Sequence, residues 1–297
     1  MRRFLSGYTS LKALGSGEKA NVTEYLRELA DLINRYSRSV RFEARASGGG
    51  ISNLGSVESG AADMGITHPD VAKDALEGTG EFEGNPHINL RHLTTVGIGA
   101  QLLYTLADSP INSLSDLRGK KINMMGGTGT NVIGRLMLKA VDIDPDKDAY
   151  CERMPVGDSI GAMRDGKFEA TFRFVFVPAD YRKIFGNDRS IKFISVEQRL
   201  IDKIAEQRGP FFLGHSIEGI ELGMDRSVFC LAMPSMLVIR KQVDPEAAYE
   251  VLKILFEHSE EMTGGFRGIK PRDGLRGLSI PFHPGAEKYY REKGLVN

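Results

Sequence analysis

The chain of 297 residues is 41% hydrophobic and carries 39 Lys plus Arg against 39 Asp plus Glu, so its formal net charge is zero. This length and composition are those of a soluble protein of one large or two medium domains. The zero net charge argues against broad nucleic-acid binding, which requires a basic face to displace counterions. We therefore expect no nucleic-acid partner.

The cysteines and the N-terminal segment limit the class further. Cys151 and Cys230 are too few for a disulfide framework, and we expect two buried free thiols rather than one bridge. No Cys and His residues have metal-site spacing, so the sequence predicts neither a metal nor a cofactor. Residues 1–15, MRRFLSGYTSLKALG, hold two arginines but no apolar stretch of useful length, so we expect no export signal in the printed chain. No segment approaches the ~20 apolar residues of a membrane span.

A strand–helix alternation begins near residue 11. After a short strand and a small-residue loop, the segment up to residue 34 has the apolar periodicity of one helix face. That face comprises Val22, Tyr25, Leu26, Leu29, Ala30 and Ile33. VRFEARASGGG then predicts a strand that ends in glycines, SNLGSVESG a short helix closed by Gly60, and AADMGIT a further strand.

The same order of elements returns from residue 121. KINMMGGTGTNVIGRLMLKAVDI predicts a strand, a small-residue loop and a helix, with one apolar face formed by Val132, Ile133, Leu136, Met137 and Ala140. YCERMPVG predicts the next strand, DSIGAMRDG a short helix closed by Gly166, and FEATFRFV the last strand. The offset is roughly 110 residues, which indicates a structural pseudo-repeat, although a coincidental alternation would look alike.

Two β-α-β-α-β units predict an α/β protein of two lobes, each a mostly parallel sheet flanked by helices. One lobe is predicted from residues 1–98 with a return segment 228–297, entered by the strand SVFCLAMPSMLVIRK, and the other from 99–227. Ligands of such sheets lie beyond the carboxyl ends of the strands, against helix N-termini. We expect a ligand cleft between the lobes.

The loop from Gly126 to Thr130 opens a predicted helix, so its N–H groups and the helix dipole favour an anion. A phosphate loop would require a lysine just before Ser or Thr, whereas this helix continues with Asn131 and Val132. The dinucleotide fingerprint is matched only loosely. A structural turn remains an alternative, but we favour a small carboxylate, bound by these N–H groups and the hydroxyls of Thr128 and Thr130.

Single polar residues add candidates. GSGEKAN supplies Ser16, Gly17 and Asn21 before the first helix, with turn and capping chemistry as the alternative role. Arg173 is a charged residue in the apolar strand ATFRFVF, and it either clamps a ligand carboxylate or makes an internal pair. His68 follows the strand MGIT, where it either contacts ligand or caps a helix with Asp70.

Arg45, in FEARAS, is a weaker candidate of the same kind as Arg173. His283 in FHPG is predicted to be structural, and Tyr289 and Tyr290 are predicted to be packing residues. We find no Ser-His-Asp ordering or other constellation that commits the chain to catalysis, so no catalytic residue is assigned.

Four stretches resemble the TAXI-type solute-binding proteins of TRAP transporters. They are SGGGISNLGSVESGAADMGITHPDVA, LTTVGIGAQLLYTLADSPINSLSDLRGKKINMMGGTGTN, AMRDGKFEATFRFVFVP and the tail PFHPGAEKYYREKGL. The tail is similar to the closing pattern HPGA-x-x-YY-x-E-x-G of that family and is the most specific of the four. The resemblance covers the chain from about residue 11 onward.

The resemblance implies a type II periplasmic-binding-protein fold and an extracytoplasmic receptor that closes on a small organic anion, such as glutamate or a related carboxylate. TRAP permease membrane subunits would be its partners, and we expect a monomer. By position, the resemblance implies ligand contacts from Ser47, Gly48, Thr67, His68, Thr128, Gly129, Thr130 and Asn131.

Two other functions remain open. The first is a cytoplasmic enzyme on the same fold, a decarboxylase-like lyase acting on a small carboxylate, in which His68 and Arg173 would supply acid–base and carboxylate-orienting groups. The second is the ligand-sensing module of a regulator, which is weak because no DNA-binding or signalling segment is attached.

Overall fold

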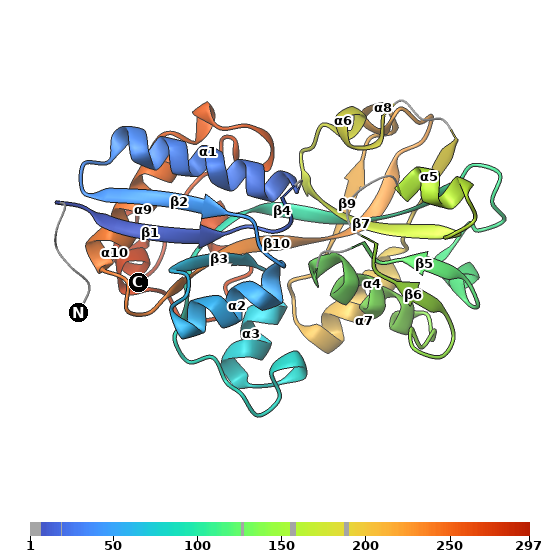
Figure 1. Cartoon of the computed structure of the whole chain (residues 1–297), viewed down its shortest axis with the longest axis horizontal. Helices are drawn as coiled ribbons and strands as arrows, with labels where there is room; N and C mark the ends of the chain where they lie inside the picture. Colours follow the sequence, from blue (N-terminus) through green and yellow to red (C-terminus); the bar gives the residue numbers. More distant parts are fainter. Residues whose placement is uncertain (1–6, 19, 126–127, 155–158, 187–189) are drawn as a thin grey trace. The chain divides into compact units, whose positions relative to one another are not determined.

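The computed structural model describes residues 7–18, 20–125, 128–154, 159–186 and 190–297. The chain divides into two compact units, which are drawn with their element labels in Figure 1. The first unit comprises the chain up to Gly97 together with Pro234–Asn297, and the second comprises Ile98–Met233.

The first unit contains the first repeat. Its strands are β1 (Thr9–Leu14), β2 (Val40–Arg45) and β3 (Met64–Thr67), and its helices are α1 (Asn21–Tyr36), α2 (Gly50–Ser59) and α3 (Pro69–Glu77). β1 pairs in parallel with both β2 and β3, so the spatial order is β2-β1-β3. All six residues of the predicted apolar face of α1 are buried. Gly60 ends α2 with φ 76°, a left-handed conformation that favours glycine.

The second unit contains the second repeat. Its strands are β5 (Lys121–Asn123), β6 (Tyr150–Glu152) and β7 (Ala170–Val177), and its helices are α4 (Thr128–Ala140) and α5 (Ser159–Arg164). β5 pairs in parallel with β6 and β7, which gives the order β6-β5-β7. The predicted pseudo-repeat is therefore confirmed, with the first strand of each repeat in the middle. Of the predicted face of α4, Ile133, Met137 and Ala140 are buried, whereas Val132 and Leu136 are half-buried.

Two long strands contribute to both units. β4 (Leu90–Leu106) pairs antiparallel with β7, and β10 (Val228–Arg240) pairs antiparallel with β3. The hydrogen-bonded order is β2-β1-β3-β10-β4-β7-β5-β6, with β8 (Ile191–Ile194) on β4 and β9 (Leu213–Ile217) on β10. Residues 228–233 belong to the second unit, so the chain re-enters the first unit at Pro234. The α/β class with mostly parallel repeats is confirmed.

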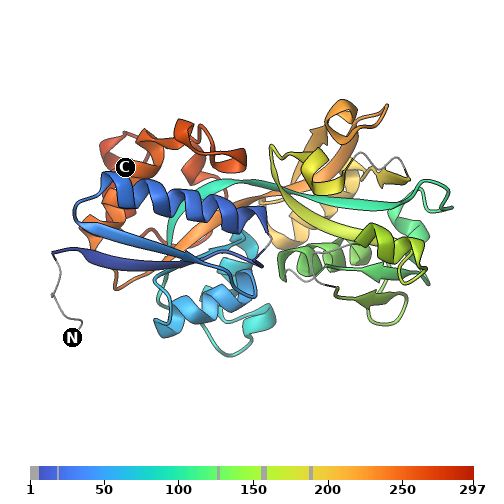
Figure 2. The same cartoon turned by 45° about the horizontal axis from the view of Figure 1, so that its top comes forward.

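Helices cover both faces of the strands in each unit (Figures 1 and 2). In the first unit, α2 and α3 pack with β10 residues in one apolar cluster, and α1 packs against α9 (Pro245–Glu257), which also contacts α10 (Pro284–Glu292). In the second unit, α4 and α7 (Gln198–Arg208) share one cluster. α5, α6 (Tyr181–Phe185) and α8 (Gly219–Leu222) share another.

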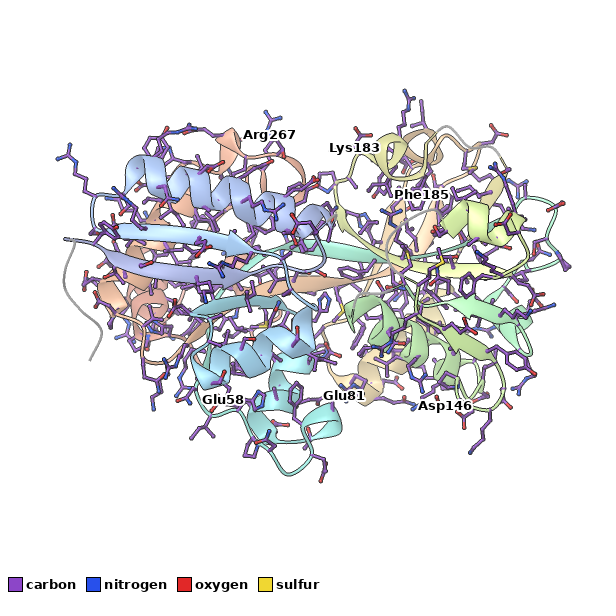
Figure 3. The ribbon with its side chains drawn as sticks, viewed as in Figure 1. Glu58, Glu81, Asp146, Lys183, Phe185 and Arg267 are labelled. Carbon is purple, nitrogen blue, oxygen red and sulfur yellow. The ribbon has the colours of Figure 1, made fainter. Side chains whose placement is uncertain are left out.

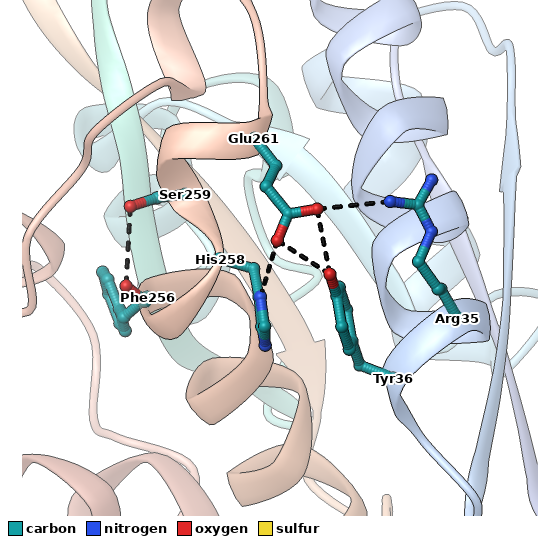
Figure 4. Close-up of polar contacts among 6 residues, drawn as sticks. All are labelled: Arg35, Tyr36, Phe256, His258, Ser259 and Glu261. Atoms are coloured by element: carbon teal, nitrogen blue, oxygen red, sulfur yellow. Dashed lines mark hydrogen bonds and ion pairs between the residues drawn. The ribbon is translucent and has the colours of Figure 1, made fainter.

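The return segment is fastened to α1 by a polar cluster (Figure 4). The Glu261 carboxylate accepts hydrogen bonds from the Tyr36 hydroxyl at 2.9 Å and from Arg35 at 3.2 Å. Its Oε1 lies 2.8 Å from His258 Nδ1, and the His258 ring stacks on Tyr36 at 3.6 Å between ring centres. These contacts attach the end of α9 to the end of α1 within the first unit.

In the C-terminal tail PFHPGAEKYYREKGL, His283, Tyr289 and Tyr290 contact other parts of the first unit. His283 caps α10, accepting from Gly285 N–H at 3.2 Å, and its Nε2 lies 3.1 Å from the Val243 carbonyl. The Tyr290 hydroxyl donates to Thr94 at 2.8 Å, and the rings of Tyr289 and Tyr290 are buried. The predicted structural roles of these three residues are confirmed.

The cysteines are free, as predicted. Cys230 is buried, whereas Cys151 is only half-buried on β6, which lies at the end of the strand order. Among the described residues, no helix combines the length and apolar character needed to cross a membrane.

Candidate functional site

In the first unit, β1, β2 and β3 are parallel and end at one edge, where α2 begins. Asn53 joins two of these ends, because its Nδ2 donates to the carbonyls of Gly15 and Ile66 at 2.8 Å each. Ser47 holds the turn into α2: its hydroxyl donates to the Gly15 carbonyl at 3.0 Å and accepts from Gly49 N–H at 3.1 Å. Neighbouring Gly48 faces the Ser52 hydroxyl. Side-chain hydrogen bonds therefore connect the strand ends with the start of α2.

Thr67, the last residue of β3, lies at this edge and is 1% exposed. A Cβ added to Gly50, the first residue of α2, would lie 3.1 Å from the Thr67 hydroxyl oxygen, so the two are close neighbours. That hydroxyl has no hydrogen-bond partner among the described residues. A buried hydroxyl without a partner costs free energy, which a bound ligand or water would recover.

His68 occupies the N-cap position of α3, but its ring does not cap the helix. Its Nδ1 lies 3.3 Å from the Pro234 carbonyl, which corrects the alternative of a side-chain cap. Burial lowers the pKa of His68, while the nearby Asp70 carboxylate and the Pro234 carbonyl act in the opposite direction. The protein therefore places a largely buried imidazole next to Thr67.

The loop before α1 uses local contacts. Thr23 accepts from Ser16 N–H at 2.9 Å and donates to the Gly17 carbonyl at 3.1 Å. Asn21 begins α1, and its Oδ1 accepts from Val22 N–H at 3.0 Å. These hydrogen bonds correspond to the turn and capping role that was the alternative to ligand binding for this loop. Arg45 is exposed and pairs with Glu43 at 2.5 Å.

In the second unit, α4 starts at Thr128, beyond the carboxyl end of β5. Gly126, Gly127 and the Thr128 side chain lie outside the described part of the chain, and Gly129 is half-buried in the first turn. The Thr130 hydroxyl accepts from the backbone N–H of Phe174 in β7 at 3.3 Å, and Asn131 is buried next to it. The first turn of α4 is therefore tied to the middle of β7.

Arg173 lies on the opposite face of β7 from α4. Its cross-strand partner Leu102 belongs to the cluster of α5 and α6, whereas Phe172 belongs to that of α4. The guanidinium donates to the Ile184 carbonyl at 3.3 Å and lies 5.2 Å from the ring centre of Phe185, which is labelled in Figure 3. Burial lowers the pKa of Arg173, and interaction with Tyr104 opposes this shift. The structure does not bring Arg173 together with Thr130.

Gln101 was missed by the sequence reasoning. It is 0% exposed on β4, directly opposite Phe174, and neither side-chain polar atom has a hydrogen-bond partner among the described residues. Its signal was present, because it interrupts the apolar run VGIGAQLLYTL just as Arg173 interrupts ATFRFVF. Asn53 carried no such signal, since a polar residue at the start of a helix is ordinary.

Two α/β units with parallel repeats and shared long strands define the class of periplasmic-binding-protein-like folds. XAC2383 from Xanthomonas citri bound to ATP is 15% identical over 98% of this chain and 100% of that chain, with a TM-score of 0.56. The periplasmic aliphatic sulphonate binding protein SsuA from Escherichia coli is 14% identical over 95% and 78%, with a TM-score of 0.45. An ancestral arginine-binding protein bound to arginine is 12% identical over 97% and 99%, with a TM-score of 0.48.

At these identities the similarity shows the fold. The sequence profile of the NMT1-like family matches residues 22–294, and the chain belongs to that family.

Proposed function

We propose that this protein is an extracytoplasmic solute receptor that binds a small organic carboxylate and delivers it to the membrane subunits of a transporter. Membership of the NMT1-like family, and a fold shared with XAC2383, whose structure holds a bound small molecule, support a ligand-binding role. The similarity of its SGGG segment and HPGA tail to TAXI-type proteins favours a TRAP-type transporter. The observation that carries the proposal is the buried, unpartnered Thr67 hydroxyl beside the start of α2.

The chemistry of this edge suits an anion. The first turn of a helix presents N–H groups without intrahelical acceptors, and the helix dipole adds partial positive charge. α2 begins with glycines, so the ligand can approach its backbone closely. A carboxylate oxygen there would accept from these N–H groups and from the Thr67 hydroxyl. Ser47, Gly48 and His68 would line the same edge.

The second unit offers an equivalent edge at the first turn of α4, formed by Thr128, Gly129, Thr130 and Asn131. We propose these residues as further ligand contacts, with Asn21 as the remaining candidate. One charge is well matched by a dipole and hydroxyl groups, whereas the P-loop pattern adds a lysine to neutralise the larger charge of a phosphate, and no lysine is adjacent here.

The first test is a binding screen of the full chain by thermal shift, followed by calorimetry. Short mono- and dicarboxylates, glutamate, an aliphatic sulphonate and arginine are the probes. A carboxylate at ~100 times its Kd should add about 2.7 kcal/mol to the free energy of unfolding. If only the sulphonate stabilises the protein, the carboxylate assignment is wrong.

The second test replaces Thr67. Thr67→Val keeps the side-chain shape and removes the hydroxyl, so we expect the affinity for the carboxylate to fall about threefold to tenfold. The stability of the free protein should stay level or rise, because an unpartnered buried hydroxyl is lost. The matched control is Thr105→Val, whose hydroxyl donates to the Glu169 carbonyl at 2.6 Å. That variant should lose stability and keep its affinity.

A third measurement separates a receptor from an enzyme. NMR of the carboxylate incubated with the protein should recover it unchanged, whereas decarboxylation would contradict the proposal. A gene whose 5′ end encodes a signal sequence, next to a multi-span permease, would support delivery to a transporter. A cytoplasmic start among catabolic genes would favour the enzyme.

A further inference from the structure

Gln101 is a buried polar residue of the second unit whose side chain lacks hydrogen-bond partners among the described residues. Its carboxamide is fully buried on β4, and both Nε2 and Oε1 lack hydrogen-bond partners among the described residues. Buried polar side chains in native proteins nearly always have partners, because an unmade hydrogen bond forfeits the solvation that the group had in water. Such a side chain is a candidate for a hydrogen bond to a group beyond the described residues, such as a bound ligand.

The pairing of β4 with β7 fixes the face on which this side chain lies. Gln101 is opposite Phe174, and Leu103 is opposite Phe172. Leu103 and Phe172 belong to the α4 cluster and Phe174 packs against it, whereas Leu102 belongs to the cluster on the other face. Since side chains alternate along a strand, Gln101 points to the face that carries α4.

The same pairing places Gln101 near the first turn of α4. The Phe174 N–H donates to the Thr130 hydroxyl at 3.3 Å, so the start of α4 lies directly beside Phe174. Residues opposite each other in an antiparallel pair have Cα atoms about 4.5–5.5 Å apart. Farther along α4, Gly134 packs against Phe172 and Met124, which continues the same contact line. Gln101 and the start of α4 are therefore both direct neighbours of Phe174.

The start of α4 and the Gln101 carboxamide together determine which kind of ligand would satisfy both. The first turn of α4 favours an anion, and Gln101 Nε2 can donate a second hydrogen bond to it. Oε1 only accepts, so a bare carboxylate would leave it unsatisfied. A donor on the carbon next to the carboxylate, a hydroxyl or an ammonium group, would satisfy Oε1 at the same time.

We infer that Gln101 is a specificity-determining residue that selects carboxylates with a hydrogen-bond donor on the adjacent carbon. This inference rests on the proposed function, because the first turn of α4 must hold a carboxylate. The selecting groups are the Gln101 carboxamide and the α4 helix start, all within the second unit.

Calorimetry on the full chain tests the inference with matched probes: lactate and alanine against propionate, and malate and aspartate against succinate. The unmutated protein should bind at least one of the probes that carry a hydroxyl or ammonium group about tenfold or more tightly than the matched probe without it. Gln101→Met removes both polar atoms at similar length, so the preference should shrink to about threefold or less. Gln101→Leu is measured in parallel, so the result does not depend on the folding of one variant.

Thermal unfolding without ligand gives an independent readout. Gln101→Met should raise the Tm of the free protein by about 2 °C, because a buried carboxamide without a partner is removed. A Gln101 that is satisfied by ordered water would instead give a lower Tm and an unchanged preference. That result would overturn the inference.

The two proposals fail in different ways. A parent that binds carboxylates without preferring the donor overturns the role of Gln101 and leaves the receptor function standing. A parent that binds none of these carboxylates overturns the carboxylate assignment, and the Gln101 inference with it.

Discussion

At the residue scale, His92 shows how a buried imidazole can hold the return segment in place. Its Nε2 lies 2.9 Å from the Gly274 carbonyl, and its ring meets Phe282 edge-on at 5.4 Å. The His92 backbone N–H donates to the Pro281 carbonyl at 2.8 Å, and the His92 carbonyl accepts from the His283 N–H at 3.0 Å. Burial lowers the pKa of His92 from 6.5 to about 4, so the neutral ring is the folded form near neutral pH.

This shift predicts acid sensitivity. Between pH 6.5 and pH 4 the unfolded chain binds a proton at His92 that the folded chain does not bind, so stability falls as the pH drops. The contribution of His92 alone should approach about 3 kcal/mol at pH 4. Burial shifts the pKa values of His68 and His283 in the same direction, which adds to the loss.

Urea unfolding at pH 7 and pH 4.5 measures this dependence. His92→Gln keeps an N–H donor for the Gly274 carbonyl but does not titrate, so its loss of stability between the two values should be smaller than that of the parent by about 2–3 kcal/mol. An equal loss in both proteins would show that other groups cause the acid sensitivity.

At the element scale, β7 serves two different cores through its alternating side chains. Phe172 faces the α4 cluster and Val175 faces the cluster of α5 and α6. Arg173 shares the second face, where it contacts Tyr104, the Ile184 carbonyl and the ring of Phe185. These contacts attach α6 to the sheet.

Arg173→Met should therefore act mainly on stability. We expect a loss of about 1–3 kcal/mol, because a charge-assisted hydrogen bond and a cation–π contact disappear. The affinity for the carboxylate should change less than threefold, measured by calorimetry on the folded variant. An affinity loss of tenfold or more, with stability unchanged, would instead make Arg173 the carboxylate clamp predicted from its position in the strand.

At the scale of the whole molecule, the two repeats have the same strand order, and in each the last strand pairs with a long antiparallel strand. β3 pairs antiparallel with β10, and β7 pairs antiparallel with β4. The last strand of each repeat is thus hydrogen-bonded to a long strand that contributes residues to both units. In such a fold, helices begin beyond the carboxyl ends of the parallel strands and their first turns favour anions. This arrangement does not by itself select a nucleotide.

We therefore predict that ATP does not stabilise the protein, although XAC2383, a protein of similar fold, binds it. The helix start after β5 has no adjacent lysine to neutralise phosphate charge. Thermal shift with ATP should show no change under conditions in which the carboxylate raises the Tm, and a chelator should leave the Tm unchanged. Micromolar ATP binding by calorimetry, or stoichiometric zinc or iron in native protein, would contradict these expectations.

The sequence by itself determined the repeat. Apolar periodicities of 3.6 and 2 residues, glycines that end helices and the offset between the patterns depend on local chemistry, which a single chain displays directly. The face of α1 and the closing Gly60 were predicted for this reason. The structural roles of His283 and Tyr290 were also within reach, because a His-Pro-Gly helix start and adjacent aromatic residues have few other uses.

Only the tertiary structure decided how polar residues inside strands are used. Gln101 and Arg173 give the same signal in sequence, one polar side chain in an apolar strand. Pairing of β4 with β7 places them on opposite faces, one without a partner beside the start of α4 and the other among the contacts of α6. Register between strands that are distant in sequence sets these positions, because a shift of one residue exchanges the two faces, and no local pattern records that register.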